Sequence, residues 1–259
     1  MSTVLYASPI FGPVHSRRLG ISLGINLMPA DGKVCTFDCI YCECGFNAAH
    51  RPTLPRPTRE EVAKALEAKL LAMRTDGLLP DVLTFAGNGE PTGHPDFEGI
   101  IDDTVALRNT YCPAARVSVL SNATLCGRES VHRALLKVDN NILKLDTVDA
   151  DYIRRVNAPT GSYDVQTVVE NIKSFQGHAI VQTLFMKGEG PDGQSVDNTK
   201  EAYVAPWLAA VKEIAPQAVM VYTIDRETPA HNLKKATHEE LDSIVARVQA
   251  LGIPASASY

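Results

Sequence analysis

The sequence predicts an α/β protein in which parallel strands alternate with helices. Short runs rich in Val, Ile and Leu recur along most of the chain, and segments with helical spacing of apolar residues separate them. Pairs of helix-capping residues open two of these segments, and glycine or polar residues follow the apolar runs. The chain has 259 residues, a length at which an α/β barrel is routinely one domain.

The first predicted strand covers residues 18–27, where apolar residues alternate with small or polar ones. A proline and a glycine end it, and a loop with several cysteines follows. Thr58 and Glu61 have the spacing of a capping box, in which each residue satisfies a free backbone N–H of the first helical turn. They predict a helix that extends to about Met73.

Regular alternation of strands and helices begins after that helix. Strands are expected at 82–86, 116–120, 141–145, 179–185 and 218–222, and helices at 96–109, 127–138, 165–175 and 202–214. Thr237 and Glu240 cap a last helix, which ends near Gly252. Six such units form right-handed βαβ crossovers and a parallel sheet. The pattern alone allows either an open, curved barrel or a flat, doubly wound sheet.

Polar or glycine-containing segments follow each predicted strand. In chain order these segments are 33–45, 87–92, 121–124, 146–147, 187–190 and 223–226. The carboxyl ends of parallel strands meet at one edge of the sheet, and α/β enzymes place their active sites there. The sequence therefore predicts a site assembled from these loops at that edge.

Cys35, Cys39 and Cys42 lie in the loop 33–45 with C-x3-C-x2-C spacing. Thiolate sulfur selects zinc, copper(I) or iron–sulfur centres, and clusters are commonly held by closely spaced cysteines. A fully protein-ligated cubane takes four cysteines, so three would leave one iron open to another ligand. The alternative is structural zinc with Cys44 or His50 as a further ligand, although such sites usually draw on two separated ligand pairs.

This cysteine motif, with Tyr41 before its last cysteine, resembles the signature of the radical S-adenosylmethionine (SAM) superfamily. The segments 11–20 and 87–92 resemble its wyosine-synthase-like branch more narrowly. The resemblance implies a TIM-like partial (β/α)6 barrel with parallel strands, and we expect residues 1–259 to form one such domain with no separate auxiliary domain. It also implies that the three thiolates hold a [4Fe–4S] cluster whose fourth iron chelates SAM. An electron from the cluster would then cleave SAM to methionine and a 5′-deoxyadenosyl radical.

The resemblance also assigns residues to the cofactor. The segment 87–91 resembles a G-G-E-P motif with one asparagine inserted, and Glu90 would accept a hydrogen bond from the ammonium group of SAM. Ser121 and Asn122 resemble an S-N-G-T loop in which Ala123 replaces the glycine. Ordinary turns, caps or core positions are the competing interpretations. The residues expected to bind SAM are Tyr41, Gly87, Asn88, Gly89, Glu90, Ser121, Asn122, Asp146 and Asn157.

The cysteines outside the motif, Cys44, Cys112 and Cys126, are too scattered to predict a second cluster. Cys126 follows the loop 121–124, where it would act as a hydrogen-atom donor or, alternatively, as a buried, inert thiol. The segment Ser16-Arg17-Arg18 predicts either a phosphate or carboxylate site or a solvated basic turn.

Composition narrows the class of protein. The net charge is −5, 45% of the residues are hydrophobic and 21% are charged, as in ordinary globular proteins. No apolar run approaches the ~18 residues of a membrane span, and the N-terminus lacks the apolar stretch of a signal peptide. Six cysteines are too sparse in a chain of this length to form a disulfide scaffold, and their clustering indicates a metal site in a reducing cytoplasm. The negative charge gives no general attraction for nucleic acid.

We therefore expect a cytoplasmic radical SAM enzyme that acts on a small-molecule or protein substrate. The resemblance implies an external electron donor such as flavodoxin or ferredoxin. A wyosine-type tRNA-modifying enzyme is disfavoured by the net charge and by the absence of cysteines before Cys35. A protein-activating radical enzyme is a further alternative. A non-catalytic, zinc-binding barrel protein is the alternative from another class.

Overall fold

The computed structural model describes residues 3–16 and 20–259, and within them eight strands form one sheet in the order β1-β2-β3-β4-β5-β6-β8-β10. These strands are β1 (Ile10–Ser16), β2 (Gly20–Ile25), β3 (Val82–Phe85), β4 (Arg116–Ser121), β5 (Asn140–Lys144), β6 (Ile180–Leu184), β8 (Ala218–Tyr222) and β10 (Ala255–Ser258). Neighbouring strands from β2 to β10 are parallel, whereas β1 is antiparallel to β2.

The helices follow the strands as the sequence pattern predicts. They are α1 (Arg59–Thr75), α2 (Phe97–Tyr111), α3 (Glu129–Leu135), α4 (Ala150–Val156), α5 (Val165–Lys173), α6 (Glu201–Ile214) and α7 (His238–Gln249), with 3₁₀ turns η1 (Asn47–Ala49) and η2 (Pro91–Gly93). The capping boxes of Thr58 with Glu61 and of Thr237 with Glu240 are both formed, as predicted. The six expected strand–helix units, β2 to α7, are thereby confirmed.

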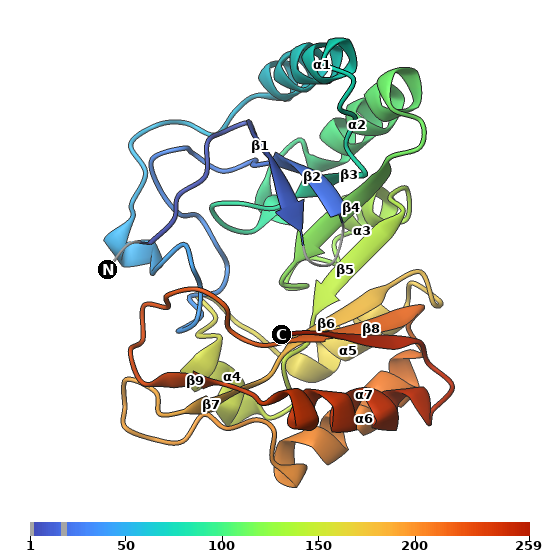
Figure 1. Cartoon of the computed structure of the whole chain (residues 1–259). Coiled ribbons are helices and arrows are strands. Elements are labelled where there is room, and N and C mark those ends of the chain that lie inside the picture. The colour runs from blue at the N-terminus through green and yellow to red at the C-terminus, as the bar shows by residue number, and fades with distance from the viewer. Residues whose placement is uncertain (1–2, 17–19) are drawn as a thin grey trace.

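Figure 1 shows the strands fanned into a curved sheet, with the helices packed on its outer side. Within the described residues, β1 and β10 are the two edges of this sheet. The fold is therefore an open, partial TIM-like barrel. The loops that follow the carboxyl ends of the strands gather at the opposite side from α2, α6 and α7, and we call the edge formed by the loops after β2 to β6 the mouth.

Several elements in the structure extend the pattern that the sequence predicts. The first parallel strand is shorter than the predicted 18–27, of which residues 18 and 19 lie outside the described residues. The edge strands β1 and β10 were not predicted, because a glycine–proline pair interrupts β1 and only alanine and serine make up β10. The short helix α4 and the small antiparallel pair β7 (Met186–Gly188) and β9 (Leu233–Lys235) were also missed.

The two faces of the sheet differ in chemistry. The apolar residues that face the helices belong to one large core, which includes Phe85, Phe97 and Trp207. The inner face carries polar residues that pair across strands: Ser22 Oγ and Thr84 Oγ1 are 2.8 Å apart, as are Asn140 Nδ2 and Ser118 Oγ. We call this inner face of the sheet the lumen.

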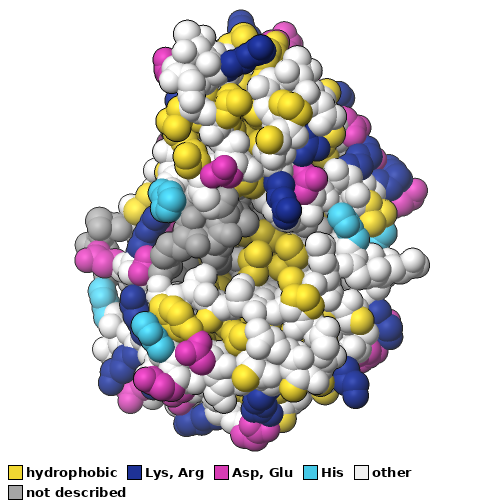
Figure 2. All heavy atoms as spheres, turned by 45° about the vertical axis from the view of Figure 1, so that its right-hand side comes forward, with side chains coloured by type: hydrophobic (Ala, Val, Ile, Leu, Met, Phe, Trp, Pro, Cys, Tyr) yellow, Lys and Arg dark blue, Asp and Glu magenta, His cyan; other side chains and the backbone are white. Residues whose placement is uncertain are grey.

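The surface of the molecule has a hollow. Figure 2 shows this hollow between the part of the molecule that bears α1 and α2 and the part that bears α6 and α7, and hydrophobic side chains gather in it. Among the described residues, we find no helix that combines the length and the apolar character needed to cross a membrane.

Candidate active site

The cysteine loop leaves the carboxyl end of β2 and is closed by hydrogen bonds of its own backbone. Cys42 N donates to Cys39 O at 3.1 Å, and Gly45 N donates to Cys42 O at 2.9 Å. Lys33 is buried beneath this loop, and its ammonium group donates to Gly45 O at 2.6 Å and to Asp38 Oδ1 at 3.2 Å. All the cysteines of the loop are free thiols, so they are available as ligands.

The three motif thiols are electrostatic neighbours. Burial raises the pKa of Cys35, and it raises that of Cys39 to about 11, with the nearby thiols contributing in the same direction. A hydrogen bond with Cys44, together with Lys33, lowers the pKa of Cys42 to about 6. Burial lowers the pKa of Lys33, but the three thiols and Asp38 outweigh this and raise it overall. Lys33 is therefore the buried cation that favours the thiolate of Cys42, and Lys144 acts in the same direction on Cys39.

The loop after β3 is bound to the cysteine loop at backbone level. Val34 N donates to Asn88 O at 2.9 Å, and Glu90 N donates to Val34 O at 3.1 Å. Between these bonds Gly89 has φ +143°, and a Cβ atom on it would lie 1.8 Å from Val34 O. Glycine is required here, because any side chain would separate the two loops.

Glu90 is buried at the centre of this contact and accepts hydrogen bonds from two neighbouring loops. Its Oε1 accepts from Thr92 N at 3.1 Å, from Thr92 Oγ1 at 2.5 Å and from Ser121 Oγ at 2.8 Å. Its Oε2 accepts from Asn122 N at 2.7 Å. Burial raises the pKa of Glu90 despite these bonds. The carboxylate therefore joins the loops after β3 and β4.

The loop after β4 reaches the first motif cysteine. Asn122 Nδ2 donates to Thr36 Oγ1 at 2.7 Å and lies 3.6 Å from Cys35 Sγ, within range of a hydrogen bond to sulfur. Ala123 takes φ +64°, the left-handed conformation that glycine usually supplies. The turn is thus kept although the residue differs from the motif it resembles.

A second hydrogen-bond network centres on Asp146, which is buried after β5. Its Oδ2 accepts from the Tyr41 hydroxyl and from Asn157 Nδ2, the latter at 2.8 Å, and its Oδ1 accepts from Leu184 N at 2.9 Å. Asn157 Nδ2 also lies 3.7 Å from Cys39 Sγ. Tyr41, Asp146 and Asn157 are therefore brought together, as the sequence predicts for residues of one site.

Lys144 belongs to this network but was not among the residues predicted from the sequence. Its ammonium group donates to the hydroxyls of Tyr41 at 3.1 Å and Tyr222 at 3.0 Å, and it lies 3.7 Å from Asp146 Oδ1. Burial lowers the pKa of Lys144, but Asp146, Tyr222 and Cys39 together outweigh burial and raise the pKa overall. A lysine at the carboxyl end of β5, just before the predicted site residue Asp146, was the available signal.

Asn88 is placed differently from the other predicted cofactor residues. Its Oδ1 accepts from Tyr6 N at 2.7 Å, and its Nδ2 donates to Tyr6 O and to Pro29 O, both at 2.9 Å. The side chain therefore holds the N-terminal segment against the loop after β3. These bonds account for its burial without a cofactor contact.

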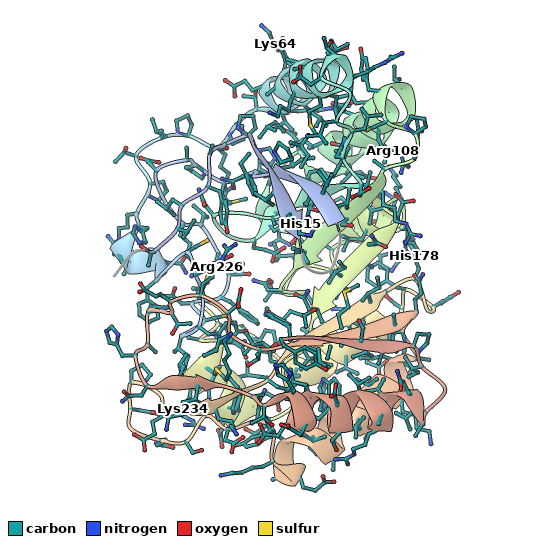
Figure 3. All side chains as sticks on the ribbon, in the orientation of Figure 1. His15, Lys64, Arg108, His178, Arg226 and Lys234 are labelled. Atoms are coloured by element: carbon teal, nitrogen blue, oxygen red, sulfur yellow. The ribbon has the colours of Figure 1, made fainter. Side chains whose placement is uncertain are left out.

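The loop after β8 also reaches the cysteine loop. Arg226 Nη1 donates to Glu43 Oε2 at 2.6 Å and to the Tyr6 hydroxyl at 2.8 Å. Figure 3 shows Arg226 on the mouth side of the molecule, whereas Lys234 lies further out, at the β7–β9 pair. Glu43 directly follows Cys42, so this ion pair ties the loop after β8 to the end of the three-cysteine motif.

The cysteines outside the motif have different surroundings. Cys44 Sγ donates to Gly87 O at 3.4 Å, which ties the end of the cysteine loop to the loop after β3. Cys112 and Cys126 are buried in the apolar core, and burial raises the pKa of Cys126 to about 12. The hydrogen-atom donor role of Cys126 stays a prediction. In the predicted segment 16–18, Arg17 and Arg18 lie outside the described residues.

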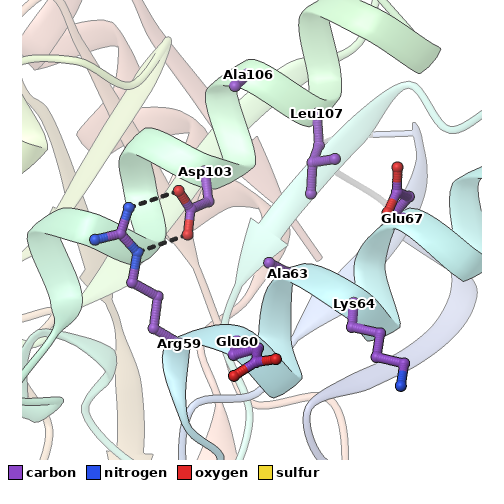
Figure 4. A pocket seen from close by; sticks show the side chains of 8 residues that line it. All are labelled: Arg59, Glu60, Ala63, Lys64, Glu67, Asp103, Ala106 and Leu107. Atoms are coloured by element: carbon purple, nitrogen blue, oxygen red, sulfur yellow. Dashed lines mark hydrogen bonds and ion pairs between the residues drawn. The ribbon is translucent and has the colours of Figure 1, made fainter.

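Two further features bear on what the site is. Within the described part of the chain, no group of three or more His, Cys, Asp or Glu side chains is arranged to hold a single metal ion. A surface groove of about 630 Å³ lies between α1 and α2, with the Arg59–Asp103 ion pair at its side (Figure 4). This groove is in the helix layer and shares no residue with the mouth.

An open parallel barrel with a three-cysteine loop at its mouth is the architecture of radical SAM enzymes, and comparison with known proteins supports this class. The family model described as the radical SAM superfamily matches residues 31–197, more than half of the chain. The chain therefore belongs to the radical SAM superfamily, whose members generally use a [4Fe–4S] cluster and SAM. It is 33% identical to the UPF0026 protein of Helicobacter pylori strain J99, over 90% of this chain and 71% of that protein.

Solved structures share the fold at low sequence identity. A radical SAM methyltransferase from Sphaerobacter thermophilus superposes with a TM-score of 0.66 and 14% identity, over 92% of this chain and 66% of that one. SuiB from Streptococcus suis bound to S-adenosylmethionine gives a TM-score of 0.63 and 15% identity, over 90% of this chain. This chain spans about half of SuiB and just under two thirds of the methyltransferase.

Proposed function

We propose that Cys35, Cys39 and Cys42 hold a [4Fe–4S] cluster at the mouth and that SAM binds beside it. The protein would then be a radical SAM enzyme that cleaves SAM reductively. When bound, the cluster and SAM together supply a 5′-deoxyadenosyl radical. Three cysteine ligands leave one iron of a cubane without a protein ligand, which suits the chelation of an amino acid. The barrel that carries these residues is proposed to act as one domain.

The observation that carries this proposal is the pair of hydrogen-bond networks that end on motif sulfurs. One runs from Glu90 through Asn122 to Cys35 Sγ, and the other runs from Asp146 through Asn157 to Cys39 Sγ. Hydrogen bonds to ligand sulfurs orient them and tune the potential of a cluster. The networks start in two different loops, so their convergence on one set of thiols supports a metal centre rather than scattered core cysteines.

Glu90 has acceptor capacity for the ammonium group of SAM. A carboxylate offers about four lone-pair sites on its two oxygens. Three protein donors reach Oε1, but only the Asn122 N–H reaches Oε2 among the described residues. The remaining acceptor position is therefore on Oε2, and it would receive a charge-assisted bond. Asp146, in contrast, is engaged by three donors and would position Tyr41 and Asn157 around the cofactor.

Enzymes of this superfamily generally need a reductant and a substrate. An external electron donor such as flavodoxin or ferredoxin would supply the electron, and the substrate would be a small molecule or a protein. Three cations near the mouth, Arg226, Lys33 and Lys144, are each paired with an acidic side chain. These pairs leave none of the three free to bind phosphates, and a tRNA substrate stays disfavoured.

Anaerobic reconstitution of the full chain with iron and sulfide tests the proposal. Cluster loading should give a brown protein that absorbs at about 400 nm, whereas a zinc-loaded protein stays colourless. With a strong reductant and no added substrate, the loaded protein should slowly convert SAM to 5′-deoxyadenosine and methionine. Cys112→Ala is the matched control, because it removes a buried thiol outside the motif. S-adenosylhomocysteine as the sole product, or intact SAM with a fully loaded cluster, would refute the radical chemistry.

A further inference from the structure

Gln182 in β6 carries an unsatisfied polar group. Its side-chain nitrogen Nε2 is buried and has no hydrogen-bond partner among the described residues, and the residue as a whole is 7% exposed. Buried polar groups in native proteins are nearly always paired, so each exception calls for an explanation. An amide with two free N–H donors is suited to an acceptor that comes from outside the chain.

The strand geometry directs Gln182 into the lumen. Successive side chains of a strand point to opposite faces of a sheet. On either side of Gln182, Val181 belongs to the core beneath the helices, and Thr183 Oγ1 receives the Trp207 indole N–H from α6 at 3.1 Å. Both neighbours therefore face the helices, and Gln182 faces the opposite way.

Lys144 lies beside Gln182 on the same face. The two residues are cross-strand partners in the register of β5 and β6, so their side chains leave the sheet next to each other. The Lys144 ammonium group has three N–H donors, of which two go to Tyr41 and Tyr222. Its third N–H has only the 3.7 Å contact with Asp146, and the Asp146 carboxylate already accepts hydrogen bonds from Asn157 and Leu184. This third N–H can therefore donate to a further acceptor.

The lumen is reachable at this level of the barrel. Along β8, the lumen-facing residues Ala218, Met220 and Tyr222 are partly exposed, whereas Val219 and Val221 between them are buried under the helices. Met220 is the partner of Gln182 in the register of β6 and β8. Four other polar residues of the inner face are paired with each other across β2 to β5, namely Ser22 with Thr84 and Ser118 with Asn140. Gln182 and Lys144, in contrast, have spare donors on the face of the sheet that is partly exposed at β8.

We propose that the lumen binds the substrate as a small carboxylic acid, whose carboxylate accepts hydrogen bonds from Gln182 Nε2 and Lys144 Nζ. An ammonium group beside a two-donor amide complements an anionic group with two acceptor oxygens. Lys144 also contacts Tyr41 of the cysteine motif, so the acid would lie directly below the proposed cofactor site. The role of this acid as the substrate rests on the function proposed above, whereas the binding of a carboxylate does not.

Binding is tested on the full chain without metal and again after cluster loading. Saturation-transfer NMR measures the binding of acetate, malonate and succinate, each compared with its amide. The acids should bind and the amides should not. Gln182→Leu keeps the size of the side chain but removes its donors, and it should weaken acid binding about tenfold or more. Gln166→Leu, at an exposed position, is the matched control and should bind like the parent protein.

Further outcomes separate the alternatives. Because Gln182→Leu removes an unsatisfied buried group, its unfolding temperature should equal or exceed that of the parent protein, and Gln182→Met serves if that variant does not fold. Competition between acids and SAM would mean that these donors serve the carboxylate of SAM, which would overturn the proposal. Equal binding of acids by Gln182→Leu would also overturn it. Acid binding without SAM cleavage would instead refute the proposed function and leave the carboxylate site standing.

Discussion

The Glu90→Gln variant tests the role of the residue that joins the loops after β3 and β4. The substitution keeps the shape of the side chain but replaces one carboxylate oxygen by an amide group. The three donors at Oε1 favour the amide oxygen at that position. The NH2 group is then placed at Oε2, where it faces the Asn122 N–H and the position proposed for the ammonium group of SAM.

The magnitude follows from the bonds that change. A hydrogen bond to a charged group contributes about 1.5–3 kcal/mol, so losing the one to SAM should weaken SAM binding about 10- to 100-fold. The stability of the free protein should change less. The lost bond from Asn122 is opposed by the removal of a buried negative charge, whose desolvation already raises the pKa of Glu90.

Calorimetric titration of the cluster-loaded variant with SAM measures this effect. Iron content and absorption should match the parent protein, since Glu90 lies outside the cysteine loop. Glu60→Gln, at an exposed position in the first turn of α1, is the matched control. An unchanged SAM affinity in Glu90→Gln would remove Glu90 from the cofactor site, and loss of iron would assign it to the cluster instead.

Three further predictions follow from single contacts. Cys35→Ala should abolish the absorption at about 400 nm, whereas Cys126→Ala should retain it, and the reverse would contradict the ligand assignment. Gly89→Ala should lower the unfolding free energy by more than about 2 kcal/mol in urea titrations, and Gly161→Ala, which meets nothing within 4 Å, should stay within about 0.5 kcal/mol. The hydrogen bond from Arg133 lowers the pKa of the Glu98 carboxyl from 4.5 to about 2, so the stabilisation from this ion pair is present above pH 4.5 and is lost as the pH falls towards 2. In urea titrations at pH values between 4.5 and 2, the unfolding free energy of Glu98→Gln should therefore fall less than that of the parent protein. An equal fall in both proteins would show that other groups cause the loss of stability in acid.

Local patterns predicted the elements that determine the architecture. The capping boxes at Thr58 and Thr237 and the apolar runs at 116–120 and 218–222 lie where the structure has the corresponding helices and strands. These features depend on neighbours within a few residues, so they can be read from the chain alone. The edge strand β10 could not be predicted from the chain alone, because its four small residues become a strand only by pairing with β8.

For the candidate site as well, some features follow from the sequence and others only from the tertiary structure. The sequence by itself determined the three-cysteine loop and the polar segments after each strand, because their spacing is local. Only the tertiary structure decided that Asn157 reaches Cys39 across 118 positions, and that Asn88 holds Tyr6 across 82. It also decided that Lys144 and Gln182 stand side by side, because the register between β5 and β6 pairs them. A shift of one residue in that register would turn one of the two side chains to the other face of the sheet, and no local pattern encodes it.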